Sequence, residues 1–169
     1  MKIKIDVFDP HSIDAAIKKL EDYSKDLDRK AEMLCERLAQ IGVMYAEWNF
    51  SSVDWMYSGD VDYAIDAVRI SENKYAVTVN GEGVLFIEFG AGSTLGYGHP
   101  TPVLGETQMG PGTYPNGKGH WNSPNGWWYV NGDGTKVHTY GNAPGMPMYN
   151  AAKDLRQEIA KTAREVFRS

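Results

Sequence analysis

The sequence predicts an α+β fold in which a long N-terminal helix and a C-terminal helix pack on a small antiparallel sheet. Apolar residues recur at helical spacing early in the chain and again near its C-terminal end. Between these regions, two alternating apolar segments are typical of a β-hairpin. A segment rich in glycine, proline and tryptophan, residues 90–147, follows the hairpin, and we interpret it as an ordered insertion that contains a second hairpin.

The N-terminal region predicts a short strand and then the long helix. Lys2 to Phe8 alternate in polarity, and Pro10 and Ser12 are expected to start the helix, with Ser12 as its N-cap. Helical spacing of three and four then places one apolar stripe along a helix of about 30 residues. The stripe consists of Ile13, Ile17, Leu20, Leu27, Ala31, Leu34, Leu38, Ile41 and Tyr45, and only Ser24 interrupts it.

Two arrangements of this helix are consistent with the stripe. The helix lies over its own sheet and partly over the second helix, or its free end packs on a neighbouring subunit. In the second case Leu27 and Leu34 are candidate interface residues.

The predicted sheet is a hairpin that leads into a short apolar segment. Its strands are residues 63–70 and 75–79, joined by a turn at residues 71–74, and Asn80-Gly81 is a further turn signal. Residues 84–89 are too uniformly apolar for their periodicity to distinguish a short buried helix from a strand. Gly90 and Gly92 end this segment.

Glu88 is the unusual residue of that segment, because Ile87 and Phe89 flank it. A buried carboxylate is costly unless it is hydrogen-bonded or paired. Glu88 therefore either faces the surface of a short helix or accepts hydrogen bonds from the backbone of the glycine turn or of the 142–147 loop.

The insertion holds 14 of the 18 glycines and 7 of the 8 prolines, together with three of the five tryptophans. Because a disordered linker lacks such aromatic residues, we expect an ordered loop. Residues 126–130 and 135–140 form its hairpin around the turn 131–134. Its Trp127, Trp128 and Tyr129 are candidate interface residues.

Pro147 opens the final helix, with the predicted buried stripe Met148, Ala152, Leu155, Ile159 and Val166.

Composition limits the classes of function. A chain of 169 residues with 42% hydrophobic content suffices for one domain, residues 1–169. Its net charge of −5 disfavours non-specific nucleic-acid binding, although basic residues crowd the last helix, where a solvated face is the plain interpretation. We expect no disulfide, because Cys35 is alone. No signal peptide and no membrane segment are expected, and a reduced cytosolic site of synthesis fits the lone cysteine.

The sequence shows no pattern typical of catalysis or of a cofactor. The histidines and Cys35 lack metal-ligand spacing, although His99 and His120 could meet by folding. Asn131-Gly-Asp-Gly134 is similar to the start of a calcium loop, but Asn142 stands where that loop needs Glu. We therefore predict no enzymatic activity, metal, cofactor or small-molecule substrate.

Two motifs carry a resemblance to a known family. Glu88-Phe89-Gly90-Ala91-Gly92 and the turn Pro144-Gly145-Met146-Pro147 before the last helix resemble the signatures of the neck or tail-completion proteins of long-tailed bacteriophages, with Met146 where arginine is usual. The resemblance implies a virion structural protein at the head–tail junction that assembles into a ring of its own copies. It also implies adjacent head-completion and tail proteins as partners, with DNA at most passing through the ring lumen.

An alternative comes from the insertion. Gly126-Trp-Trp-Tyr-Val-Asn-Gly-Asp-Gly-Thr135 resembles one unit of the aromatic hairpin repeats with which bacterial surface proteins hold choline or cell-wall glycans. Such repeats normally occur in arrays, and this chain has one copy. A regulatory protein that dimerises through the long helix is a third interpretation.

Overall fold

The fold is described from a computed structural model that covers residues 3–53, 62–81, 83–92, 99–100, 123–130 and 133–168. The elements, in chain order, are α1 (Pro10–Val53), β1 (Tyr63–Ser71), β2 (Lys74–Gly81), α2 (Val84–Phe89), β3 (Trp127–Val130), β4 (Lys136–Thr139) and α3 (Pro147–Arg168). Two antiparallel hairpins, β1–β2 and β3–β4, accompany the helices. The predicted α+β class, with a long first helix, a final helix and small antiparallel sheets, is confirmed.

Helix α1 has 44 residues, well beyond the predicted length. It starts after Asp9, whose carbonyl accepts from the N–H of Ile13 and whose Oδ1 accepts from the N–H of His11 at 3.0 Å. Asp9 is therefore the N-cap and Pro10 the first helical residue. The prediction of Ser12 as the cap was wrong, because its Oγ accepts from the N–H of Asp6 instead.

The N-terminal segment is not a strand. Residues 3–9 have no ladder partner and form a turn before α1, so the strand predicted over residues 2–8 is wrong for the described part of that range. Alternation alone does not supply the partner that a strand needs.

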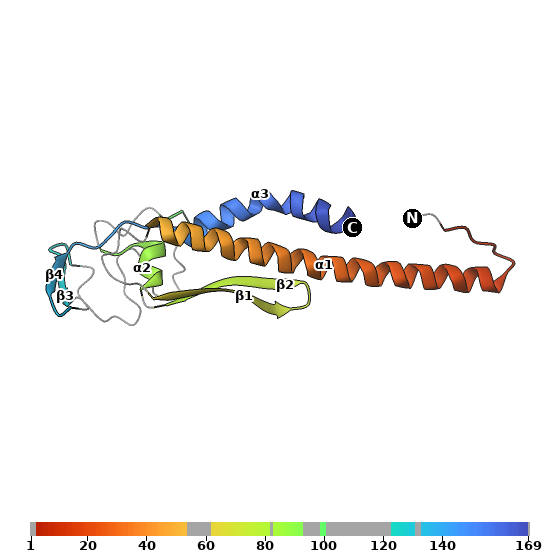
Figure 1. Cartoon of the computed structure of the whole chain (residues 1–169), viewed down its shortest axis with the longest axis horizontal. Coiled ribbons are helices and arrows are strands. Elements are labelled where there is room, and N and C mark those ends of the chain that lie inside the picture. The colour runs from red at the N-terminus through yellow and green to blue at the C-terminus, as the bar shows by residue number, and fades with distance from the viewer. Residues whose placement is uncertain are drawn as a thin grey trace.

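The elements form an elongated molecule around α1. The β1–β2 hairpin lies along one side of α1 and α3 lies along another, both on its C-terminal half (Figure 1). The N-terminal half of α1 extends beyond both, and no described helix or strand lies beside it (Figure 1). The first predicted arrangement therefore holds for the C-terminal half of α1 and not for the N-terminal half.

The core lies where α1 ends. Phe50, Val84 and Ile87 are buried together, and side chains from the hairpin and from the start of α3 pack around them. Close packing extends along α1 to Gly42, where an added Cβ would lie 2.8 Å from Cγ2 of Val77 on β2. Glycine at this position lets the hairpin approach the helix.

An ion pair fixes the turn of the β1–β2 hairpin to α1. The Glu32 carboxylate accepts from Nε of Arg69 at 2.5 Å, from the N–H of Asn73 at 2.6 Å and from the hydroxyl of Tyr75 at 3.0 Å. Arg69, followed by the Asn73 N–H, holds the pKa of Glu32 below its usual value. No pattern in the sequence singled out Glu32 for this role.

The buried stripe of α3 is rotated from the predicted one. Ala151, Thr162 and Val166 are buried, whereas Ala152 is exposed and Ile159 is 43% exposed. The prediction that Ala152 and Ile159 face the core was therefore wrong. Ala152 lines the groove between α3 and β2 that is described below.

Candidate functional site

The two sequence motifs meet at one place, which we call the α2–α3 joint and define as residues 86–92 and 142–149. Its centre is Glu88, which is only 8% exposed. The Glu88 carboxylate accepts from the N–H of Met148 at 2.8 Å and from the N–H of Tyr149 at 3.0 Å. The predicted surface-facing placement of Glu88 is wrong, because the carboxylate is buried and hydrogen-bonded. Its partners also differ from the predicted glycine turn or 142–147 loop, because the donating N–H groups belong to the first turn of α3.

Glu88 acts as a remote N-cap of α3. The carbonyl of Met146 accepts the first helical bond, from the N–H of Asn150 at 2.9 Å, so Met146 occupies the cap position. Its thioether cannot serve as the oxygen acceptor that a cap normally provides for the second and third residues of the helix. Glu88 supplies that oxygen from another element, and its charge lies at the positive end of the helix dipole.

The backbone of the loop before α3 completes the joint. The carbonyl of Ile87 accepts from the N–H of Gly145 at 2.7 Å, and the carbonyl of Phe86 accepts from Nδ2 of Asn142 at 2.9 Å. Ala91 and Asn142 exchange two backbone hydrogen bonds. Carbonyls at the end of α2, which a helix cannot pair internally, thus bond to the loop that leads into α3.

The glycines of the first motif are required by this contact. Gly90 and Gly92 have φ angles of 75° and 94°, which side chains rarely adopt. A Cβ on Gly90 would lie 2.6 Å from the carbonyl oxygen of Asn142, and one on Gly92 would overlap the carbonyl oxygen of Tyr140. Phe89 and Pro144 belong to the same two segments, and Pro147 is among the most deeply buried residues.

His99 contacts residues from both segments of the joint. Its Nε2 lies 3.0 Å from Oε1 of Glu88, and its ring packs against Phe89 and Tyr149 with centroid separations of 4.6 and 5.6 Å. No periodicity or motif marked His99 as the partner of Glu88, so sequence reasoning missed it. The suggested meeting of His99 with His120 lies outside the described residues.

The structure places the predicted interface residues in two regions. Leu27 is 37% exposed on the free half of α1, whereas Leu34 is partly buried where α3 and the hairpin begin to cover that helix. Trp128 and Tyr129 are 67% and 39% exposed on β3, and Trp127 is partly buried. The ring of His138 lies between those of Trp128 and Tyr140, at 4.9 and 5.0 Å.

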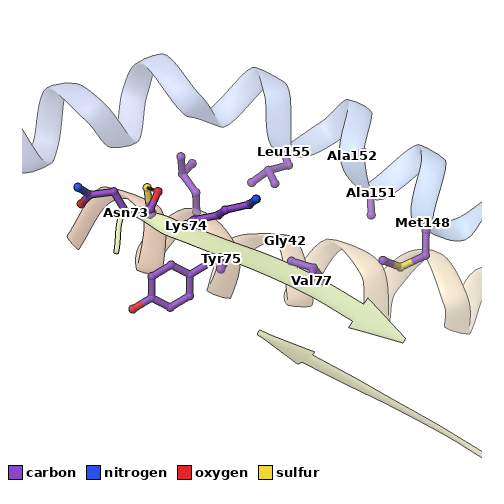
Figure 2. A pocket seen from close by; sticks show the side chains of 12 residues that line it. Gly42, Asn73, Lys74, Tyr75, Val77, Met148, Ala151, Ala152 and Leu155 are labelled. Atoms are coloured by element: carbon purple, nitrogen blue, oxygen red, sulfur yellow. Dashed lines mark hydrogen bonds between the residues drawn. The ribbon is translucent and has the colours of Figure 1, made fainter. Parts of the chain in front are cut away.

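An apolar groove of about 410 Å³ lies between α3 and β2, with α1 as its floor (Figure 2). Met148, Ala151 and Leu155 project into it from α3, and Gly42 and Val77 line it from below (Figure 2). The thiol of Cys35, at one end, donates to the carbonyl of Asn73 at 3.1 Å. These lining residues offer apolar contact and do not form a set of acid, base and nucleophile.

Within the part of the chain that the structure describes, no three histidine, cysteine or acidic side chains are grouped so that they could hold a metal ion. Among the same residues, no helix has the length and apolarity needed to cross a membrane. What the described surface offers is contact area on α1, on the outer face of α3 and on the β3–β4 hairpin.

Comparisons of the chain with protein-family models, with curated proteins and with solved structures give no match.

Proposed function

We propose that this protein is a virion structural component of the head–tail connector region of a long-tailed phage or prophage, a neck or tail-completion subunit that acts by ring assembly. The observation that carries the proposal is the α2–α3 joint. The residues behind the family resemblance, Glu88 to Gly92 and Pro144 to Pro147, form one hydrogen-bonded unit that orients α3.

The exposed surface supports an assembling role. Ile13, Ile17, Leu20 and Leu27 are each at least 37% exposed along the free half of α1. Exposed apolar side chains that recur along one face of a helix mark an interaction site in a soluble protein. A ring with closed symmetry stabilises such modest contacts, because every copy uses the same surfaces.

Inactivation of the gene in its phage or prophage genome tests the proposal. Electron microscopy of lysates should show DNA-filled heads separate from tails, and expression of the wild-type chain in trans should restore joined particles. Joined, infectious particles without the chain would refute the proposal. A variant such as Gly90→Ala, with the joint disrupted, should fail to restore them.

A second candidate rests on the β3–β4 hairpin. Trp128, His138 and Tyr140 lie in a row with edge-on ring contacts, and Trp128 and Tyr140 are 67% and 58% exposed. Such a row suits a sugar ring or a quaternary ammonium group. Titration of tryptophan fluorescence with choline and with soluble peptidoglycan fragments tests it, with Trp128→Ala as the control. A saturable change that Trp128→Ala abolishes would favour this candidate over the connector.

A further inference from the structure

We infer that the free half of α1 in one copy packs against the outer face of α3 in the next copy, so that the protein associates head to tail. The inference deepens the proposed function, because it rests on ring assembly and assigns the two surfaces that meet. Each surface has exposed apolar side chains, and the charges beside them are opposite.

The first surface is the apolar stripe on residues 10–30 of α1. Its four members Ile13, Ile17, Leu20 and Leu27 belong to the same stripe that is covered further along the helix, with Ser24 as its one interruption. One edge of it is acidic, because residues spaced by seven fall on the same side of the helix. That edge consists of Asp14, Glu21 and Asp28, all exposed.

The second surface is the outer face of α3. Phe167 is 43% exposed there, and Ala160, seven residues earlier on the same side, is also exposed. The face is basic, and its exposed cations are Lys153, Arg156 and Arg164. The exposed Phe167 among these cations favours a protein helix as the partner over the phosphates of DNA, which would leave this ring uncovered.

The dimensions of the two surfaces agree. At a rise of about 1.5 Å per residue, residues 10–30 of α1 span roughly 32 Å and the 22 residues of α3 span roughly 33 Å. Helix α3 already covers the other half of α1 within its own chain (Figure 1). The free half is therefore long enough for one further α3, supplied by the next copy.

Pairing of two free halves with each other is less favourable. In an antiparallel pair the acidic edges, Asp14, Glu21 and Asp28, would face each other, and like charges repel. In a parallel pair they would face Ala16, Tyr23 and Lys30, and Lys30 already forms an ion pair with Asp26 of its own helix. A contact between two different surfaces is heterologous, and it closes into a ring when the rotation between copies allows it.

The test uses two charge-reversed full-length variants, D14K/E21K/D28K on α1 and K153E/R156E/R164E on α3. Each variant alone sets like charges against each other at the contact, whereas a 1:1 mixture restores opposite charges at every contact. Sedimentation velocity and light scattering over a wide concentration range should show that the wild type associates. We expect each variant alone to associate roughly a hundredfold more weakly, from three rim pairs turned from attraction to repulsion, and the mixture to recover.

Matched controls carry the same change in net charge on other surfaces. They are D22K/E36K/E47K for the first variant and K19E/K74E/K136E for the second, all at exposed positions. Circular dichroism should show wild-type helix content in all four variants. The controls should associate as the wild type does, which separates a local charge contact from a general effect of net charge.

Four outcomes would overturn the inference. They are a wild type that stays monomeric at every concentration, variants that associate as the wild type does, controls that weaken association equally, and a mixture that fails to recover. If only the α3 variant loses binding to a labelled DNA duplex and the mixture does not assemble, the basic face serves DNA instead. None of these results alters the gene-inactivation test, so the proposed function can stand while this contact fails.

Discussion

Replacement of Glu88 by alanine tests the α2–α3 joint directly. The change removes the acceptor of two backbone N–H groups in the first turn of α3, and it leaves His99 without its carboxylate partner. A hydrogen bond to a charged group contributes about 1.5–3 kcal/mol, and loss of an N-cap costs about 1 kcal/mol and up to about 2. The hydrogen-bond contribution and the N-cap cost describe the same two amides, so they are not added together. We therefore expect the free energy of unfolding to fall by about 3 kcal/mol in total.

For a chain of this size, about 2–4 °C of melting temperature corresponds to 1 kcal/mol, so Glu88→Ala should melt about 6–12 °C below the wild type. Thermal unfolding followed by circular dichroism measures the shift. Glu47→Ala, at an exposed position on α1, is the matched control and should stay within about 0.5 kcal/mol of the wild type. Glu88→Gln keeps one oxygen acceptor and should fall between the two. If Glu88→Ala melts together with Glu47→Ala, the joint does not stabilise the fold as argued.

Hydrogen exchange provides a local readout of the same change. The amides of Met148 and Tyr149 should exchange faster in Glu88→Gln by a larger factor than the amides of the β1–β2 ladder. Uniform acceleration across the chain would indicate a general loss of stability, and the specific capping role of Glu88 would then be wrong.

Three further predictions follow from individual contacts. Gly90→Ala should destabilise the protein by about 1–3 kcal/mol more than Gly83→Ala in urea unfolding, because both glycines have positive φ but only the Cβ at position 90 meets backbone atoms; equal losses would show that φ alone matters. Because the pKa of Glu32 is lowered in the folded state, its contribution to stability is present above the unfolded-state pKa and is lost as the pH falls through the folded-state pKa. The stability difference between wild type and Glu32→Gln should therefore be largest near neutral pH and shrink below about pH 4, and a pH-independent difference would contradict the ion pair with Arg69. Trp128→Ala should change the melting temperature by no more than about 2 °C, because that side chain is 67% exposed; a larger fall would mean that the hairpin supports the fold.

The sequence predicted the elements better than it predicted their partners. Helices, hairpins and the glycine boundaries follow from periodicity and turn chemistry, which are local properties. The rotation of the α3 stripe was missed because Ala152 and Ile159 satisfy the same spacing as the buried residues. The strand predicted at residues 2–8 failed for a related reason, since alternation does not show whether a second strand is available.

The candidate site was predictable only in part, and the reason is its long range. Glu88 stood out because a carboxylate between Ile87 and Phe89 needs a partner, and this argument requires no structure. Its partners lie 60 and 61 residues away on α3 and 11 residues away at His99. Only the fold brings these groups together, so the sequence indicated that Glu88 needed a partner and could not show which groups would provide it.

The edge of the α1 stripe shows where the two halves of that helix differ. At intervals of seven along this edge stand Asp14, Glu21 and Asp28, and then Cys35 and Gly42. The last two line the groove where β2 approaches the helix, and at Gly42 even one added carbon would meet Val77 at 2.8 Å. Small side chains are therefore needed where the chain covers its own helix. Acidic side chains stand where it does not, so the change between Asp28 and Cys35 marks the boundary between the surface that folds the subunit and the surface left for a second copy.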